Sequence, residues 1–312
     1  MPDSFKITSV GAQPSVKDPR ANRRMGRLRL EQGEWFWRED GRGIPVLFLH
    51  GMPGDSSQWD HVLDELVMTH RDRLHCFAPD LLGCGESVSD FGSSIANQSN
   101  ALMAYLDALD LQKVWIVGTS VGAWIGCHLA IAQPDRIAGL VLLDPDGTVL
   151  PKRLQKLRRR QHRWARRSLG RQWLGFAKKF SKRATARWHQ VQYLRSHGDQ
   201  FKVWDKLLIK RPKAERQAEW LTGKLGDLQQ PVLLLRSGSS DRIAQQHYQN
   251  FSQDLDHAQH RPLEVIPPGL SAPYINDNPN SAPLLDPVNR PPEASAEIAR
   301  HLSDFILSPD AP

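Results

Sequence analysis

Short runs of apolar residues recur along this 312-residue chain, and between them lie longer segments with apolar positions three and four residues apart. Short apolar runs bounded by turn residues are typical of buried strands, and the longer spacing is typical of helices. The predicted strands are Arg27–Glu31, Glu34–Arg38, Pro45–Leu49, Leu74–Ala78, Val114–Val117, Ala138–Leu143, Val232–Leu235 and Leu263–Ile266. The predicted helices are Ser57–Met68, Ser94–Ala108, Val121–Gln133, Ala244–Leu255 and Ala294–Phe305. This alternation predicts an α/β fold with one eight-stranded, mostly parallel sheet that is covered on both faces.

A long insertion separates the sixth and seventh predicted strands. In residues 147–226, Leu, Trp and Phe recur at steps of three and four, as at Leu169, Trp173, Phe176 and Phe180, which predicts amphipathic helix. We therefore expect a flexible N-terminal segment (1–26), a core made of 27–146 and 227–312, and a helical cap formed by 147–226.

The positive charge of the chain is concentrated in this cap. The net charge is +7, but the stretch Gly147–Gly198 holds sixteen Lys and Arg and no Asp or Glu, with Trp164, Trp173 and Trp188 among them. A basic amphipathic helix with tryptophans is typical of a surface for anionic lipid. It also fits the entrance for an anionic substrate, or a solvated cap whose charges have no specific partner. A nucleic-acid patch is the least favoured interpretation.

Composition indicates a globular protein and gives an expected location. Hydrophobic residues make up 40% and charged residues 24% of the chain, and no apolar run is long enough to cross a membrane. The first 25 residues contain no apolar core of a secretory signal. The three cysteines, Cys76, Cys84 and Cys127, form no closely spaced pair. We expect a cytoplasmic protein, with a peripheral membrane contact through the cap left open.

The most informative motif is Gly118-Thr119-Ser120-Val121-Gly122, which lies between a predicted strand and a predicted helix. In a strand–turn–helix setting, G-x-S-x-G presents its serine hydroxyl at the start of the helix. Backbone N–H groups and the helix dipole favour a developing oxyanion there. The motif predicts that Ser120 is a catalytic nucleophile facing an enclosed pocket.

Two further loops connect the chain with a known family. His50-Gly51-Met52-Pro53-Gly54 follows the third predicted strand, and Asp80-Leu81-Leu82-Gly83-Cys84-Gly85-Glu86-Ser87 follows the fourth. With the serine motif, they resemble the α/β-hydrolase superfamily, in particular its branch with HGxPG and DxxGxGxS loops. That branch includes esterases, epoxide hydrolases, carbon–carbon bond hydrolases and haloperoxidase-like enzymes. The resemblance implies an oxyanion hole made by the backbone N–H groups of Met52 and Val121, and a supporting role for His50.

The resemblance also implies an acid, for which two residues are candidates. Asp241 lies in the loop after the seventh predicted strand, where the family places the carboxylate that orients a histidine. It could equally be a turn or helix-capping aspartate. Asp144, after the sixth strand, is the alternative acid, although Asp144-Pro145-Asp146-Gly147 is also a good turn sequence.

The histidine that the family expects is missing from its usual position. The family places it just after the eighth strand, in a segment such as G-x-G-H-A-P-Y, and here Ser271 stands at that position. An alignment anchored on Pro292-Glu293 gives Leu285 instead, and no histidine occurs between Arg261 and Arg300. The substitutes considered are His61, His257, His260, His301 and, in the cap, His162, His189 and His197. We expect His257 and His260 to lie before the eighth strand, at the far end of the sheet from Ser120, and His301 to be a surface residue.

Two classes of function remain open from the sequence. The first is hydrolysis of a partly apolar ester or acyl compound by Ser120 with Asp241. The second is a relative that no longer hydrolyses and instead binds a ligand or performs a lyase-like reaction, because losing the base of a serine triad costs about 10⁶ in turnover. We expect no cofactor and no metal in either case.

Overall fold

The computed structural model describes residues 8–10, 23–89, 94–168, 203, 205–237, 242–263 and 292–309, with side chains omitted for 8–10, 161–168, 208–209 and 292. Its strands are β1 Thr8–Val10, β2 Arg24–Leu30, β3 Gly33–Gly41, β4 Ile44–Leu49, β5 Leu74–Pro79, β6 Val88–Ser89, β7 Val114–Thr119, β8 Ile137–Leu143, β9 Val232–Arg236 and β10 Gln259–Pro262. Its α-helices are α1 Asp60–His70, α2 Ile95–Ala108, α3 Val121–Ala132, α4 Lys152–Ser168, α8 Lys213–Ala218, α9 Arg242–Asp254 and α10 Pro292–Ile306. Short 3₁₀ turns span Ser56–Trp59, Pro134–Arg136 and Leu225–Asp227, and a π-helical turn spans Lys206–Lys210.

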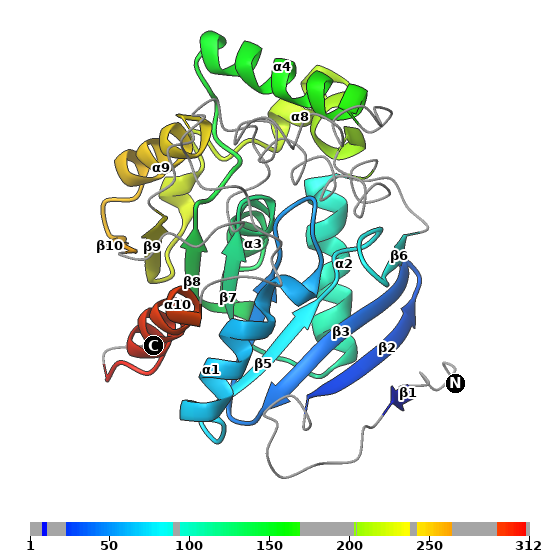
Figure 1. The fold of residues 1–312 in the computed structure, drawn as a ribbon, viewed down its shortest axis with the longest axis vertical. Helices are drawn as coiled ribbons and strands as arrows, with labels where there is room; N and C mark the ends of the chain where they lie inside the picture. The colour runs from blue at the N-terminus through cyan, green and yellow to red at the C-terminus, as the bar shows by residue number, and fades with distance from the viewer. Residues whose placement is uncertain are drawn as a thin grey trace, which may run out of the picture.

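The strands form one mixed sheet in the order β1-β2-β3-β5-β4-β7-β8-β9-β10, with β6 paired to β3. The run from β5 to β10 is parallel, whereas β1, β2 and β3 add an antiparallel edge. The expected α/β class and mostly parallel sheet are therefore confirmed. Figure 1 shows the C-terminal ends of β7 and β8 pointing to the end of the molecule where α4 and α8 lie.

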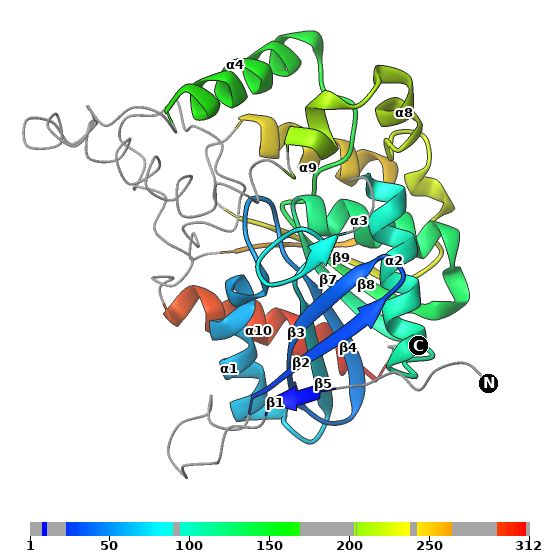
Figure 2. The same cartoon turned by 90° about the vertical axis from the view of Figure 1, so that its right-hand side faces the viewer.

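Alternate residues of each central strand enter different cores. On β4, Leu47 and Leu49 belong to one buried cluster, and Val46 and Phe48 belong to the other. The first cluster includes residues of α2 and α3, and the second includes residues of α1 and α10. Figure 2 shows these two pairs of helices on opposite faces of the sheet. Because side chains alternate across a strand, a run of apolar residues such as this one is buried on both faces.

The last strand that the structure describes begins earlier than the eighth predicted strand. β10 is at Gln259–Pro262, paired in parallel with β9, and the Leu263 N–H also donates to Arg236 O at 2.9 Å. The rest of the predicted strand, residues 264–266, lies outside the described residues. β10 is an edge strand whose side chains are mostly exposed. It can therefore consist of polar residues, and its hydrophobicity does not predict a strand. His260 therefore lies on the last strand rather than before it.

The N-terminal boundary also differs from the expectation. β2 begins at Arg24, before the predicted Arg27, and Thr8–Val10 pairs with it as β1. The side chain of Arg23 is only 5% exposed because it forms ion pairs with Asp60 at 2.8 Å and Asp64 at 2.5 Å on α1. Within the cap, the apolar positions from Leu169 to Phe180 lie outside the described residues. None of the helices that the structure describes is long and apolar enough to cross a bilayer.

Candidate active site

Ser120 occupies the turn between β7 and α3 in a conformation that few L-residues adopt. Its φ is 50° and its ψ is −114°, and it is 3% exposed. Its N–H donates to Leu143 O at 3.2 Å, and its carbonyl accepts from the N–H groups of Trp124 and Asp146. Non-glycine residues with positive φ cost strain and concentrate at functional sites. Among the described residues, the Ser120 Oγ has no hydrogen-bond partner.

The glycines on either side of Ser120 are required by the tightness of the turn. A Cβ added at Gly122 would lie 2.3 Å from the Leu49 carbonyl oxygen, and one added at Gly118 would lie 2.7 Å from the Ala123 nitrogen. Both contacts are with backbone, which has little room to move. The G-x-S-x-G spacing is therefore a packing requirement of the strand–turn–helix unit.

The loop after β4 lies directly beside the serine. A Cβ added at Gly51 would be 3.4 Å from the Ser120 Cβ, and Met52 and Val121 are both almost completely buried. The Gly51 N–H is held by Gln58 Oε1 at 2.8 Å. The predicted oxyanion residues thus lie on the two segments that adjoin Ser120.

His50 supports this loop, as the resemblance implies. Its Nε2 accepts a hydrogen bond from the Leu81 N–H at 2.9 Å, so its Nδ1 carries the proton and donates to Gly51 O at 2.9 Å. Both nitrogens are used within the two motif loops, and the ring is fully buried. His50 therefore ties the loop after β4 to the loop after β5.

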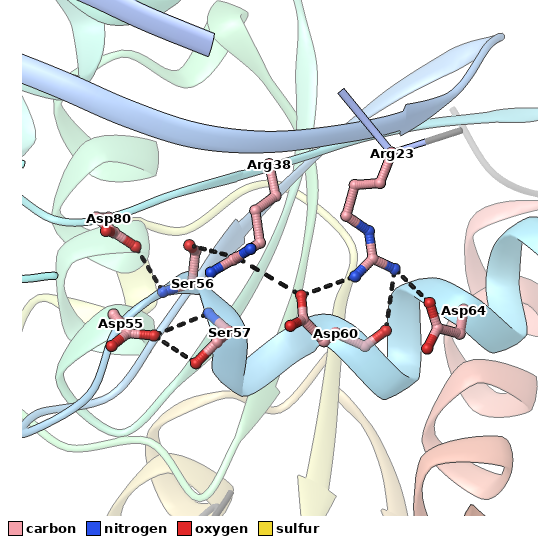
Figure 3. Close-up of polar contacts among 8 residues, drawn as sticks. All are labelled: Arg23, Arg38, Asp55, Ser56, Ser57, Asp60, Asp64 and Asp80. Atoms are coloured by element: carbon pink, nitrogen blue, oxygen red, sulfur yellow. Dashed lines mark hydrogen bonds and ion pairs between the residues drawn. The ribbon is translucent and has the colours of Figure 1, made fainter. Parts of the chain in front are cut away.

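A polar network extends this support to the start of α1 (Figure 3). The Asp80 carboxylate accepts from the backbone N–H of Ser56 and of Glu86, both at 2.7 Å. Ser56 Oγ in turn accepts from Arg38 Nε at 3.1 Å, and the same Nε lies 3.6 Å from Asp60 Oδ1. Asp80 of the DxxGxGxS motif thus holds two loop segments through its carboxylate.

Of the two candidate acids, Asp144 lies within the described residues and Asp241 lies outside them. Asp144 has φ 42° and follows β8, next to the strand that carries Ser120. Its carboxylate accepts hydrogen bonds from the N–H of Ser237, at 3.1 Å, and from the Ser237 hydroxyl. Burial raises the pKa of Asp144 to about 6, although the Ser237 hydrogen bonds and Arg236 oppose that rise.

The histidines considered as substitutes take positions that differ from the expectation in two cases. His301 is 8% exposed rather than a surface residue, because α10 packs it near Arg261, and burial lowers the pKa of its imidazole. His260 is on β10, which is separated from β7 by two strands, or about 14 Å of sheet. His257 Nε2 is 3.2 Å from Gln230 O, just before β9. Ser271, His189, His197 and the side chain of His162 lie outside the described residues.

The family can be identified from the comparison of this chain with known proteins. A family model described as the alpha/beta hydrolase family matches residues 46–280. The chain belongs to the alpha/beta hydrolase family. The match includes the β4 loop, the Ser120 turn and both candidate acids.

The curated proteins that resemble this alpha/beta hydrolase align with it over about a third of their own length. A haloalkane dehalogenase of Agrobacterium fabrum is 36% identical over 34% of each chain. Haloalkane dehalogenase 2 of Mycobacterium tuberculosis is 32% identical over 36% of this chain and 38% of its own. A cis-3-alkyl-4-alkyloxetan-2-one decarboxylase of Shewanella oneidensis is 32% identical over 36% of each.

Solved structures resemble nearly the whole chain, at lower identity. A lipase candidate from Acinetobacter baumannii has a TM-score of 0.66 at 20% identity and covers 93% of both chains. A candidate epoxide hydrolase from Pseudomonas aeruginosa has a TM-score of 0.63 at 18% identity, covering 95% of this chain and 97% of its own. At such identities the likeness concerns the fold.

Sequence reasoning missed a buried ionic cluster beside the Ser120 turn of this alpha/beta hydrolase. Asp146, whose N–H donates to Ser120 O, receives two guanidinium hydrogen bonds from Arg158 of α4, at 3.2 and 2.7 Å. Its Oδ1 is also 2.8 Å from His247 Nε2 on α9. Burial alone would raise the pKa of Asp146, but Arg158, His247 and the Gly147 N–H together hold it well below its usual range.

The ring of His247 lies between a hydroxyl and a carboxylate of this cluster. Its Nδ1 is 2.6 Å from Thr148 Oγ1, which also accepts a hydrogen bond from Asn250 Nδ2 at 2.9 Å. Its Nε2 lies close to the Asp146 carboxylate but has no partner with hydrogen-bond geometry among the described residues. One signal in the sequence could have indicated that His247 is buried. Ile243, His247 and Phe251 recur every four residues, and they lie on the buried face of α9.

Proposed function

We propose that this protein is a serine hydrolase-like enzyme that acts on a partly apolar ester or acyl compound through Ser120. The observation that carries the proposal is the Ser120 turn. It holds a buried hydroxyl without a hydrogen-bond partner among the described residues, at the N-terminus of α3 and with positive φ. A hydroxyl in that position is kept available for a reacting carbonyl rather than used for structure.

The neighbouring backbone supplies the second element of the chemistry. The N–H groups of Met52 and Val121 are our candidates for stabilising the oxyanion that forms when Ser120 attacks. The closeness of Gly51 to Ser120, and the helix dipole of α3 next to it, support this assignment. Membership of the alpha/beta hydrolase family supports hydrolysis as the general class of reaction.

The third element is the acid–base pair. Asp241 is our first choice for the acid and Asp144 the second, and Ser271 stands where a histidine base would be. Without that base the serine should be a weak nucleophile at neutral pH. We therefore expect slow hydrolysis, supported by the oxyanion hole and by substrate binding.

Covalent labelling and ester turnover test this proposal. The protein should be modified at Ser120 by a fluorophosphonate probe over hours, and it should hydrolyse nitrophenyl esters slowly but above background. Ser120→Ala should abolish both reactions, whereas Ser237→Ala should retain labelling at Ser120. Labelling at another residue, or turnover unchanged in Ser120→Ala, would contradict the assignment.

The missing histidine favours a second candidate function, a relative that binds an acyl-type ligand without hydrolysing it or that performs a lyase-like reaction. Its support is that no histidine occurs between Arg261 and Arg300. Turnover indistinguishable from background, together with saturable binding of an unhydrolysed ester, would favour this candidate.

A further inference from the structure

Helix α4 has two faces that differ sharply in what they contact. Leu154 and Leu157 pack against the buried pair Leu150 and Ile243, and Arg158 reaches inward to Asp146. With 100° per residue, these three positions fall on one side of the helix. The inward face of α4 is thus already used by the protein.

The opposite face is a stripe of cations. Lys152, Arg153, Lys156, Arg159 and Arg160 are all exposed, and they fall within an arc of about 120° on the side away from Leu154. Within the part of the chain that the structure describes, none of the five forms an ion pair with a carboxylate. The sequence continues the same spacing with Arg163, Arg166 and Arg167, and it contains no acidic residue between Gly147 and Gly198.

The position and orientation of this stripe are fixed by the fold. α4 follows β8 and lies at the end of the sheet where the C-terminal ends of β7 and β8 point (Figures 1 and 2). The buried Arg158–Asp146 pair prevents the helix from rotating its cations inward, because breaking it would leave a buried charge without a partner. The stripe is therefore presented outward, at the same end of the molecule as Ser120.

We propose that the exposed face of α4, which we call the α4 stripe (Lys152, Arg153, Lys156, Arg159 and Arg160), docks the protein on membranes that contain anionic lipid. Each Lys or Arg near an anionic bilayer contributes about one kcal/mol of attraction, so a stripe of five is enough to hold a protein at the surface reversibly. The apolar residues Leu154 and Leu157 of α4 pack on the protein, so the contact is electrostatic and does not require their insertion. The three tryptophans that the sequence intersperses with the cap's charges favour a lipid interface over nucleic acid.

Vesicle sedimentation with matched charge variants tests the docking. The full chain should bind vesicles of phosphatidylcholine with phosphatidylglycerol at low salt, detach as ionic strength rises, and ignore pure phosphatidylcholine. The variant Lys152→Gln/Lys156→Gln/Arg159→Gln should bind on the order of 100-fold more weakly. The control Arg42→Gln/Arg73→Gln/Lys113→Gln loses the same charge from exposed positions just before β4, β5 and β7, at the opposite end of the sheet. It should bind like the wild type.

Three results would overturn the docking proposal: no binding to either vesicle, an equal loss in both triple variants, or tighter binding to duplex DNA than to anionic vesicles. Because docking does not depend on catalysis, Ser120→Ala should bind vesicles normally. A failure of the proposed hydrolase activity is thereby distinguished from a failure of the docking surface. Circular dichroism of both triple variants verifies that they are folded.

Discussion

At the scale of single residues, our proposal rests on one strained serine and on a histidine that the sequence does not supply at the expected position. Ser120 is strained, buried and without a hydrogen-bond partner among the described residues, and the loop of Gly51 adjoins it. Two buried histidines have structural contacts: His50 supports two loops, and His247 lies between Asp146 and Thr148. Under our proposal the lack of a base limits the chemistry, and residue substitutions test this directly.

Restoring a histidine at position 271 should increase the reactivity of Ser120. We expect Ser271→His to accelerate both nitrophenyl ester turnover and fluorophosphonate labelling at pH 8, because an imidazole within reach could take the serine proton. The gain should be well below the full ~10⁶ of an intact triad, since a transplanted ring can miss its geometry by about an ångström.

The Ser271→His variant also serves to identify the acid. Adding Asp241→Asn to Ser271→His should remove much of the gain if Asp241 orients the new ring, whereas adding Asp144→Asn should do so if Asp144 is the acid. Brisk turnover by the wild type that disappears in Ser120→Ala would mean that a base already exists, and His301→Ala and the cap histidines would be the next variants.

Asp144 should make stability depend on pH. Its folded-state pKa of about 6 is above its unfolded value of 3.8, so the folded protein binds the proton more tightly between these values. The cost of burying the charge is therefore absent below about pH 4 and fully present above about pH 6, where it amounts to about 3 kcal/mol. Asp144→Asn should stabilise the protein above pH 6, and the advantage should vanish near pH 4.

Urea unfolding at pH 4, 6 and 8 measures this effect. Asparagine tolerates the positive φ of residue 144, and its amide can still pair with Ser237. Asp110→Asn is the matched control, because Asp110 also has positive φ but is exposed, and it should show no comparable pH-dependent difference. An advantage that stays constant from pH 4 to 8 would refute the role of charge burial.

At the scale of elements, an ion pair between Arg158 and the buried Asp146 joins α4 to the end of β8, beside the apolar contacts of Leu154 and Leu157. Asp146 follows β8, adjoins Ser120 through its backbone and binds Arg158 of α4. A buried charge that loses its partner is far more destabilising than an exposed one. The attachment of the cap and the geometry of the nucleophile turn are consequently coupled through a single residue.

Arg158→Met should destabilise the protein by about 2–4 kcal/mol, because it leaves the buried Asp146 carboxylate without its guanidinium partner. Arg159→Met, an exposed neighbour on the same helix, should change stability by less than about 0.5 kcal/mol. Adding Asp146→Asn to Arg158→Met should recover part of the loss, as denaturant unfolding can show. Equal effects of the two arginine substitutions would contradict a buried pair.

At the scale of the whole molecule, two cores on opposite faces of the sheet share the same strands. The α1–α10 face is closed by the last helix, where Leu302 is fully buried and Phe305 meets Trp115 edge-on at 5.5 Å. Strands that contribute to both cores couple the two faces, so loss of packing on one face should weaken the whole fold.

Leu302→Ala should reduce the free energy of unfolding by about 2–4 kcal/mol through the cavity it leaves. Asp304→Ala, on the exposed side of the same helix, should have an effect within about 0.5 kcal/mol. If α10 contributed little to the core, the two substitutions would give similar urea midpoints.

Much of the fold and the nucleophile could be predicted from local pattern. β4, β7 and β8 are continuous apolar runs because they are buried on both faces, and α3 follows a turn that only glycines at 118 and 122 permit. The residues of β10, Gln259–Pro262, were not predicted as strand for the opposite physical reason: an edge strand is held by backbone hydrogen bonds to β9 and needs no apolar side chains.

The sequence by itself determined the central strands and helices and the position of the Ser120 turn, because hydrophobic period and glycine placement are local properties of the chain. Only the tertiary structure decided how distant polar residues pair. Asp144 with Ser237, Asp146 with Arg158 and His247, and the burial of His301 all join segments far apart in sequence. No local pattern encodes such pairs. A charged or polar residue is expected at the surface from sequence, and its burial is stable only when the fold supplies a partner for it.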